Sequence, residues 1–221
     1  MTSKESAYLR RKWGKWLKII GRDLGNLLIS KDIFDEIRRL AGFNKQIMSP
    51  SLFYNWLVNN YIHSITIGIR RLNDCNEKSI SLYRLIEDIS ENRGAITRYY
   101  YVSRYCKWMR EKGIADSHFD KFSNKNDNLI GVHKLEGDKI RLKKDADCIR
   151  VFVNKWVAHC DIRRKRFRVP TYKDVDNTLI NIDKLFCKYH MLLTRAGMNT
   201  CKPSLLLGWK EPLRCAWIKG K

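Results

Sequence analysis

The chain has 221 residues, of which 44% are hydrophobic and 11% aromatic, enough for one domain with a sizeable core, and this composition excludes wholesale disorder. Its 44 Lys and Arg residues against 23 Asp and Glu residues give a formal net charge of +21. Such an excess costs stability through self-repulsion, and its usual compensation is a polyanion such as RNA, DNA or an anionic membrane. A general solubility charge is the alternative interpretation.

The sequence argues against several classes of protein. No run of about 18 apolar residues predicts a transmembrane helix, and Arg22 and Asp23 interrupt the only apolar stretch near the N-terminus, so no signal peptide is indicated. We therefore expect a cytoplasmic protein with no membrane partner. The seven cysteines contain no Cys-x-x-Cys pair, which predicts reduced thiols, mostly in the core, rather than a metal site. No phosphate-binding glycine loop is present, which argues against a nucleotidyltransferase or kinase activity. No cofactor is expected.

Helical periodicity dominates the first half of the chain. Ser51 and Ser79 precede two of the periodic segments and are predicted N-caps, because a serine hydroxyl can accept a hydrogen bond from the first turn of a helix. Few strand signals compete with these helices. The ranges predicted to be helical are 4–28, 32–43, 51–73, 79–90 and 95–111.

Three apolar stripes at helical spacing mark the long helices, since steps of three and four residues keep side chains on one face. They are Val58, Ile62, Ile65, Ile69 and Leu72; then Leu142, Ala146, Ile149, Val153 and Val157; and finally Val175, Leu179, Ile182, Phe186, Tyr189 and Leu193. Each stripe is expected to face a common core. The sequence therefore predicts an all-α bundle of about six to eight helices.

A polar segment, residues 117–138, precedes the helix that carries the second stripe and is predicted to be an insertion. Within and beyond it, "LIGVHKLEGDKIRL" is compatible with a β-hairpin around Gly137. After Gly197 the chain contains Gly208 and Pro212, which predict an irregular tail. We thus expect a helical domain over residues 1–197 and a C-terminal tail over residues 198–221.

Residues 93–112 interleave basic and aromatic side chains, a combination that can bind nucleic acid by stacking bases on exposed rings. Tyr101, Tyr105 and Trp108 are spaced i, i+4, i+7 and are therefore predicted to pack in the core. Tyr99 and Tyr100 are the candidates for exposure.

The stretch "VNKWVAHCDIRRKRFR" places His159 near the end of a predicted helix and follows it with a dense basic run. A histidine with a pKa near neutrality suits proton transfer, and the basic side chains suit a phosphate backbone. The alternative role for His159 is to hydrogen-bond the terminal carbonyls of the helix. The basic residues are Arg163, Arg164, Lys165, Arg166 and Arg168.

The segment "NKWVAHCD", followed by a turn at Pro170 and a second long helix, resembles the motif of the HEPN superfamily (higher eukaryotes and prokaryotes nucleotide-binding domains), in particular its abortive-infection branch. The resemblance extends to "GIRRLND", Gly68 to Asp74, at the end of an earlier long helix. Residues Asn154, Lys155, Ala158, His159 and Asp161 stand at the positions of the motif.

The resemblance implies an all-α, HEPN-like homodimer that acts on RNA as a metal-independent endoribonuclease and leaves a 2′,3′-cyclic phosphate. It also implies a role as a toxin or anti-phage defence effector, with an antitoxin or another defence protein as partner. In this interpretation His159 transfers the proton, and Lys155 and Asn154 contact the scissile phosphate or position the 2′-OH. The basic run after His159 would hold single-stranded RNA of unspecified sequence.

The chain departs from the superfamily where the motif arginine is expected, because position 153 is Val and falls in an apolar stripe. Arg150 lies nine residues before His159, which in a continuous α-helix turns it to the opposite face. Lys155 is the better substitute, one helical turn before His159. Two alternatives follow from Val153: a non-catalytic nucleic-acid-binding module, or an interaction subunit of a defence system whose enzyme is another protein.

Overall fold

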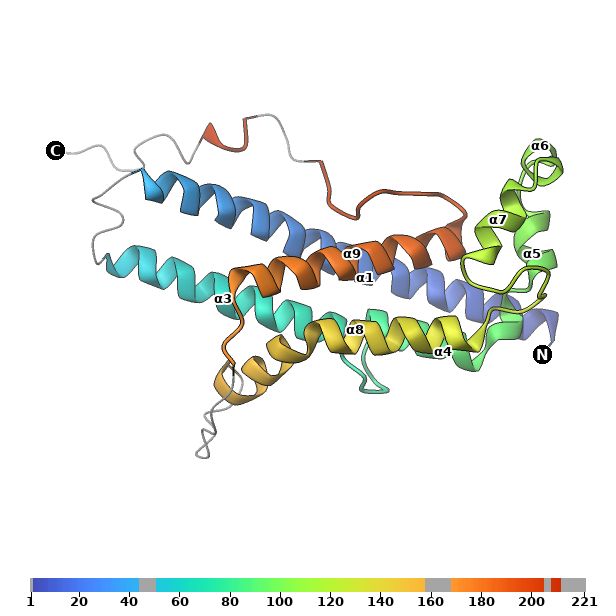
Figure 1. Ribbon diagram of the computed structural model, residues 1–221, viewed down its shortest axis with the longest axis horizontal. Helices are drawn as coiled ribbons and strands as arrows, with labels where there is room; N and C mark the ends of the chain where they lie inside the picture. Colours follow the sequence, from blue (N-terminus) through green and yellow to red (C-terminus); the bar gives the residue numbers. More distant parts are fainter. Residues whose placement is uncertain (1, 44–50, 158–167, 205–207, 212–221) are drawn as a thin grey trace.

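The computed structural model describes residues 2–43, 51–157, 168–204 and 208–211 (Figure 1). All regular secondary structure in these segments is helical, and they contain eight α-helices, labelled α1 and α3 to α9. The prediction of an all-α bundle of about six to eight helices is therefore confirmed. None of the helices in the described segments is long and apolar enough to span a bilayer.

Five helices form the body of the bundle. They are α1 (Ser3–Gly42), α3 (Leu52–Leu72), α4 (Leu82–Glu91), α8 (Val132–Phe152) and α9 (Tyr172–Thr194). Helix α1 packs against α3 and α9, and α8 packs against α3, α4 and α9. Figure 1 shows α3 and α4 following one another alongside α8, so the loop between them lies next to the middle of the bundle.

The shorter elements gather at one end of the bundle (Figure 1). They are a 3₁₀ turn η1 (Arg93–Ala95) and the helices α5 (Arg98–Ser103), α6 (Lys107–Glu111) and α7 (Ile114–Asp120). The prediction of one helix over residues 95–111 was wrong because the α-helix stops at Ser103 and restarts at Lys107. This break also explains why Trp108 is 61% exposed, since it loses the register that would align it with the buried Tyr101 and Tyr105.

The N-terminal helix is longer than the sequence indicated. Helix α1 runs without interruption through the expected break between residues 28 and 32, where the chain has neither Gly nor Pro to stop it. Thr2 and Glu5 form a capping box at its start. Ser51 caps α3 as predicted, whereas α4 is capped by Ser81 rather than Ser79.

The three apolar stripes form the core as predicted. Ile65, Ile69 and Leu72 of α3 are at most 2% exposed, and the remaining members of that stripe, toward the helix start, are half-buried. In the other two stripes every member is at most 6% exposed except Val157 and Leu193, which are half-buried. Burial of these side chains removes apolar area worth about 1.5–3 kcal/mol each from water, so the stripes stabilise the bundle together with the buried side chains of α1 and α4.

The β-hairpin expected around Gly137 was wrong, because these residues form the first turns of α8. Leu135 and Leu142 are seven residues apart and both buried against the core, which helical periodicity satisfies and strand alternation does not. Gly137 has open space around it, so it tolerates the helix. Helix α8 consequently begins at Val132, inside the segment expected to be an insertion.

One side chain makes four of the polar contacts that hold the rest of that polar segment in place. Lys134 and Arg93 add others, and Phe119 and Phe122 are buried in the core. Arg98 donates hydrogen bonds to the carboxylates of Asp116 (3.1 Å) and Asp120 (2.6 Å) and to the backbone carbonyls of Asn124 (3.0 Å) and Asp127 (2.8 Å). The Arg98 side chain is only 14% exposed. Because its donors are engaged, Arg98 acts as a structural clamp for residues 116–127.

Glycine permits the close crossing of α1 and α3. A Cβ atom on Gly68 would lie 2.4 Å from a methyl carbon of Leu27, so only glycine allows this approach without displacing Leu27. Gly68 opens the "GIRRLND" segment, and the crossing therefore fixes where the end of α3 lies.

The cysteines are more exposed than expected. Among the described residues, Cys75 and Cys106 are exposed, and Cys148, Cys187 and Cys201 are half-buried, all five as free thiols. Burial raises the pKa of the Cys187 thiol to about 12 and that of the Cys201 thiol to about 11. These two thiols are consequently poor nucleophiles at neutral pH.

Candidate nucleic-acid interface

The α-helical geometry of α8 ends at Phe152, and the chain continues as a π-turn, η2 (Val153–Val157). Val153 is 1% exposed and extends the buried stripe of α8, as its sequence position indicated. A π-turn holds more residues per turn than an α-helix, so it changes the angle between the residues before and after it. The assumption of a continuous α-helix from Arg150 to His159 was therefore wrong.

A cavity of about 450 Å³ lies between the end of α3, the α3–α4 loop and the last turns of α8. From α3 and the loop it is lined by Arg70, Asn73, Asp74 and Cys75, and from α8 and η2 by Lys143, Ala146, Asp147, Arg150 and Asn154. The cavity thus brings together the "GIRRLND" segment and the beginning of "NKWVAHCD", about 80 residues apart in the sequence.

Helical spacing explains the wall that α8 contributes. Lys143, Asp147, Arg150 and Asn154 are separated by steps of four, three and four, which places them on one face. Arg150, which the continuous-helix argument had set aside, shares this face with Asn154. Lys155 is half-buried and is not among the residues that line the cavity.

The cations of the cavity differ in how far they are already neutralised. The Arg150 guanidinium pairs with Asp147 at 2.5 Å. The Lys143 ammonium lies 4.4 Å from the centre of the Tyr83 ring, a cation–π contact that leaves the charge available. Arg70 is exposed and forms no ion pair with any residue in the described part of the chain. Arg70 and Lys143 therefore offer positive charge to a ligand in the cavity.

Asn73, another residue of the cavity lining, carries a buried acceptor. Its side-chain amide donates to the carbonyl of Ile69 at 3.0 Å, whereas its Oδ1 atom is buried without a hydrogen-bond partner in the described structure. A buried acceptor without a partner costs about 1–3 kcal/mol. Because this atom is inaccessible to solvent, it offers no contact to a ligand in the cavity.

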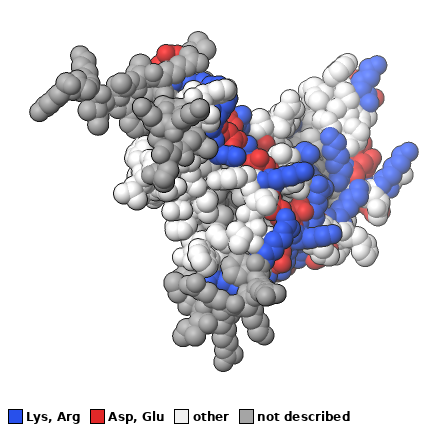
Figure 2. Space-filling view, turned by 60° about the vertical axis from the view of Figure 1, so that its left-hand side comes forward, with Lys and Arg blue, Asp and Glu red and all other residues white. Residues whose placement is uncertain are grey.

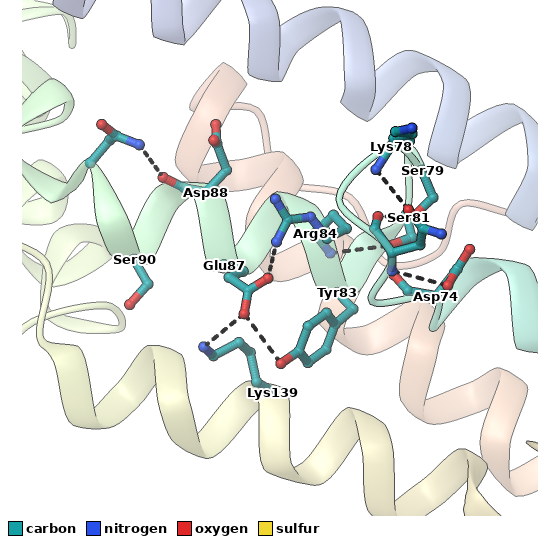
Figure 3. Close-up of polar contacts among 12 residues, drawn as sticks. Asp74, Lys78, Ser79, Ser81, Tyr83, Arg84, Glu87, Asp88, Ser90 and Lys139 are labelled. Carbon is teal, nitrogen blue, oxygen red and sulfur yellow. Dashed lines mark hydrogen bonds and ion pairs between the residues drawn. The ribbon is translucent and has the colours of Figure 1, made fainter.

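The α3–α4 loop is a fixed wall rather than a loose connection (Figure 3). The Ser81 hydroxyl donates to the carbonyl of Asp74 at 2.5 Å and accepts from the backbone N–H of Arg84 at 3.0 Å. The Asp74 carboxylate accepts from the backbone of Asn76 (3.1 Å), and the Asn76 side chain accepts from the backbone of Lys78 (2.9 Å). These bonds hold the cavity open before any ligand binds.

A second polar cluster, centred on Glu87, ties α4 to α8 next to this wall (Figure 3). Glu87 pairs with Arg84 and with Lys139 of α8 (3.8 Å) and accepts from the Tyr83 hydroxyl at 3.4 Å. The Tyr83 ring is thereby fixed beneath Lys143. The position of one cation in the cavity thus depends on α4 packing.

Arg168 is the only member of the predicted RNA-binding run that lies in the described segments. Its Nη2 atom donates to both carboxylate oxygens of Asp174, at 2.7 and 2.8 Å, and Cys148 donates to its carbonyl at 3.6 Å. Hydrogen bonds from the backbone and hydroxyl of Thr171, followed by the charge of Arg168, hold the pKa of Asp174 below its usual value. Arg168 therefore stabilises the start of α9, and the Asp174 carboxylate partly neutralises the charge of Arg168.

The other predicted residues, His159, Arg163, Arg164, Lys165 and Arg166, lie outside the described residues. On one side of them the described chain ends with η2, directly after α8, and on the other side the carbonyl of Arg168 accepts a hydrogen bond from Cys148 of α8. The structure therefore brings together Asn154 and Arg150 in one cavity and places Arg168 against α8 and α9, but gives no geometry for His159.

Sequence reasoning did not name Arg70 or Lys143 as binding residues, and it set Arg150 aside. The signal that could have found them is the polar face of α8, together with the "GIRRLND" segment already singled out. Within the described segments no group of three or more His, Cys, Asp or Glu side chains is arranged to hold a metal ion. Figure 2 shows that Lys and Arg side chains gather on one side of the face in view, interleaved with fewer acidic side chains.

Comparisons with known protein families, with curated proteins and with solved structures found no match to this chain.

Proposed function

We propose that this protein binds single-stranded RNA, with a phosphate held in the cavity between α3 and α8 and the backbone held by the basic run after His159. The observation that carries the proposal is the cavity itself. It gathers Arg70, Lys143, Arg150 and Asn154 from parts of the chain far apart in the sequence, and two of these residues, Arg70 and Asn154, lie in the segments that carry the HEPN-like resemblance. A net charge of +21 supplies the long-range attraction for a polyanion.

The same site supports metal-independent RNA cleavage. The 2′-OH of the ribose would attack the adjacent phosphorus, forming a 2′,3′-cyclic phosphate and releasing a 5′-hydroxyl. His159 would move the proton, and Asn154 would hold the 2′-OH or a phosphate oxygen. Lys155 was the predicted cation; Arg70 and Lys143 line the same cavity as Asn154 and offer the charge that would balance the phosphate, whereas Arg150 is already paired with Asp147.

One observation favours a second candidate function, a nucleic-acid-binding module without catalysis. Val153 is buried in the core, so the position where the resemblance requires an arginine cannot present any cation to RNA. If no arginine of the cavity replaces it, binding would remain and cleavage would be lost. An interaction subunit of a defence system is the third candidate, and it predicts no RNA binding.

The test is to incubate a fluorescent, mixed-sequence single-stranded RNA with the protein in EDTA and to compare wild type with His159→Ala. Cleavage that requires His159 and leaves a 2′,3′-cyclic phosphate supports the RNase. Equal, background cleavage by both proteins together with salt-sensitive binding supports the binding module. No binding at low salt contradicts both RNA proposals.

Binding at the cavity is tested separately by Arg70→Ala, with Lys125→Ala as the control, because both side chains are basic and exposed and only Arg70 lines the cavity. We expect Arg70→Ala to weaken RNA binding about tenfold, which corresponds to about 1.4 kcal/mol, and Lys125→Ala to leave it unchanged. Equal affinities of the two variants would contradict the cavity as the site.

Assembly and biological role also belong to this proposal and rest on the resemblance. We propose a cytoplasmic homodimer that serves as a toxin or anti-phage effector and is controlled by an antitoxin or another defence protein. Light scattering of the purified protein checks the dimer: a monomeric mass at all concentrations would remove that part of the proposal.

A further inference from the structure

Helix α1 carries a line of exposed cations that the proposed site does not use. Arg11, Lys15, Lys18 and Arg22 are spaced by four, three and four residues, so they share one face, and all four are exposed. At 1.5 Å rise per residue the line covers about 16 Å. We call these four residues the α1 stripe.

A groove of about 550 Å³ runs beside the first half of the stripe. Its lining includes Tyr8, Trp16 and Ile80 together with Arg11 and Lys15, and contains no carboxylate. Tyr8 is 62% exposed, so one face of its ring is open to solvent.

The third basic residue of the groove, Lys12, is already neutralised. Its ammonium pairs with Asp88 at 3.0 Å and lies 4.6 Å from the centre of the Trp16 ring. Lys12 therefore fixes the Trp16 ring in place and leaves Arg11 and Lys15 as the cations available to a ligand.

The α1 stripe leads to the cavity between α3 and α8. Arg71, the neighbour of the cavity residue Arg70, pairs with Asp23 of α1 at 3.0 Å, which places the end of α3 beside Arg22. The α3–α4 loop is also shared, because it supplies Asp74 to the cavity and Ile80 to the groove.

We propose that the α1 stripe and its groove form a second binding surface for single-stranded RNA, continuous with the cavity. Arg11 and Lys15 contact successive phosphates, and an unpaired base stacks on the open face of Tyr8. Interleaved cations and rings without carboxylates are the combination that binds single strands irrespective of sequence. This inference rests on the proposed RNA binding and extends its path to the opposite side of the α3–α4 loop.

The first experiment measures binding of a fluorescent single-stranded RNA as a function of salt for the double variant Arg11→Ala/Lys15→Ala. Removing two phosphate contacts should lower the slope of log affinity against log salt by about 1.4, at about 0.7 per contact. The matched control is Lys121→Ala/Lys125→Ala, which removes two exposed charges from the segment after α7; this segment lines neither the groove nor the cavity. The control should keep the wild-type slope.

The second experiment separates stacking from charge. Tyr8→Ala should weaken binding by about 5-fold to 150-fold, the range for loss of one stacked base, whereas Tyr8→Phe keeps the ring and should bind as wild type does. Because Tyr8 is mostly exposed, both variants should keep the wild-type melting temperature.

The outcomes distinguish this inference from the function on which it rests. If wild type binds RNA and Arg70→Ala weakens it, but Arg11→Ala/Lys15→Ala matches its control, the second surface is wrong and the cavity stands. If wild type binds no RNA, both are wrong. If Arg11→Ala/Lys15→Ala lowers the slope of log affinity against log salt and Tyr8→Ala weakens RNA binding, the second surface is supported.

Discussion

Two arginines show how differently this chain uses its positive charge. Arg98 donates to two carboxylates and two backbone carbonyls and is 14% exposed, so it has little left to offer a ligand. Arg70 is exposed beside a cavity and has no ion pair within the described structure. Both lie in basic segments of the sequence. The difference teaches that the net charge indicates a polyanionic partner, whereas the contacts of each basic side chain decide whether that side chain is available to bind it.

The same contrast separates two polar segments of the chain. Residues 116–127 are held in place by hydrogen bonds from Arg98, so this segment has a structural role. The α3–α4 loop is equally well hydrogen-bonded, but its bonds are internal, and it leaves one wall of an open cavity. A preformed open wall costs less to bind to than a wall that must be ordered first.

The largest expected effect comes from placing an arginine where the HEPN-like resemblance requires one. Val153→Arg would bury an unpaired charge in the core, and we expect a loss of about 4 kcal/mol or more in the free energy of unfolding. Urea denaturation measures it. Val169→Arg, at a position 61% exposed, is the matched control and should change stability by less than about 0.5 kcal/mol. A stable Val153→Arg variant with increased RNA cleavage would contradict the assignment of position 153 to the core.

Removing the Arg98 clamp should lower the free energy of unfolding by a smaller but still large amount. We expect Arg98→Ala to lower the free energy of unfolding by about 2–4 kcal/mol, because it leaves Asp116 and Asp120 without their cation. RNA affinity measured below the melting temperature should stay at the wild-type value. If Arg98→Ala instead weakens RNA binding without loss of stability, the contrast between clamp and cavity is wrong.

The cavity is expected to respond in the opposite way. Asn154→Asp adds a negative charge beside the proposed phosphate site and should weaken RNA binding about tenfold or more, equivalent to about 1.4 kcal/mol. Stability should change little, since Asn154 is only half-buried. Asn181→Asp makes the same chemical change on α9, outside this cavity, and serves as the control. Equal binding by both variants would argue against a phosphate in the cavity.

The smallest expected effect concerns Asp174, which joins Arg168 to the start of α9. Because its pKa is lowered in the folded state, its contribution to stability is present above about pH 3.8 and is lost as pH falls through the lowered pKa. Asp174→Asn should lower the free energy of unfolding by about 1 kcal/mol at pH 7. In urea denaturation the difference from wild type should shrink as the pH falls below 3.8. A difference that persists at low pH would show that the pair contributes nothing through charge.

Sequence patterns predicted the fold well where burial imposes a period. The stripes on α3, α8 and α9 were correct because each buried side chain constrains its neighbours three and four residues away. Patterns failed where termination depends on local geometry. Residues 95–111 have helical spacing, yet the chain breaks after Ser103, and no Gly or Pro marks the place.

The candidate site was predictable only in part. "NKWVAHCD" and "GIRRLND" were both singled out, but periodicity within one helix cannot show that two helices meet at a common cavity. The π-turn after Phe152 could not be predicted either, since no distinct sequence pattern marks it, and it removes the assumption of a continuous α-helix on which Arg150 had been set aside. Which groups a basic side chain contacts, as for Arg98 and Arg70, can be known only from the folded structure.

The most direct test of the central claim is to crosslink a 4-thiouridine-substituted single-stranded RNA to the protein with ultraviolet light and to identify the attached peptides by mass spectrometry. The account predicts crosslinks in the peptides that line the cavity, around Arg70 and around Arg150 to Asn154, and none around Arg98. Crosslinks confined to the Arg98 segment or spread evenly over all basic peptides would contradict it, because RNA would then follow net charge rather than the cavity.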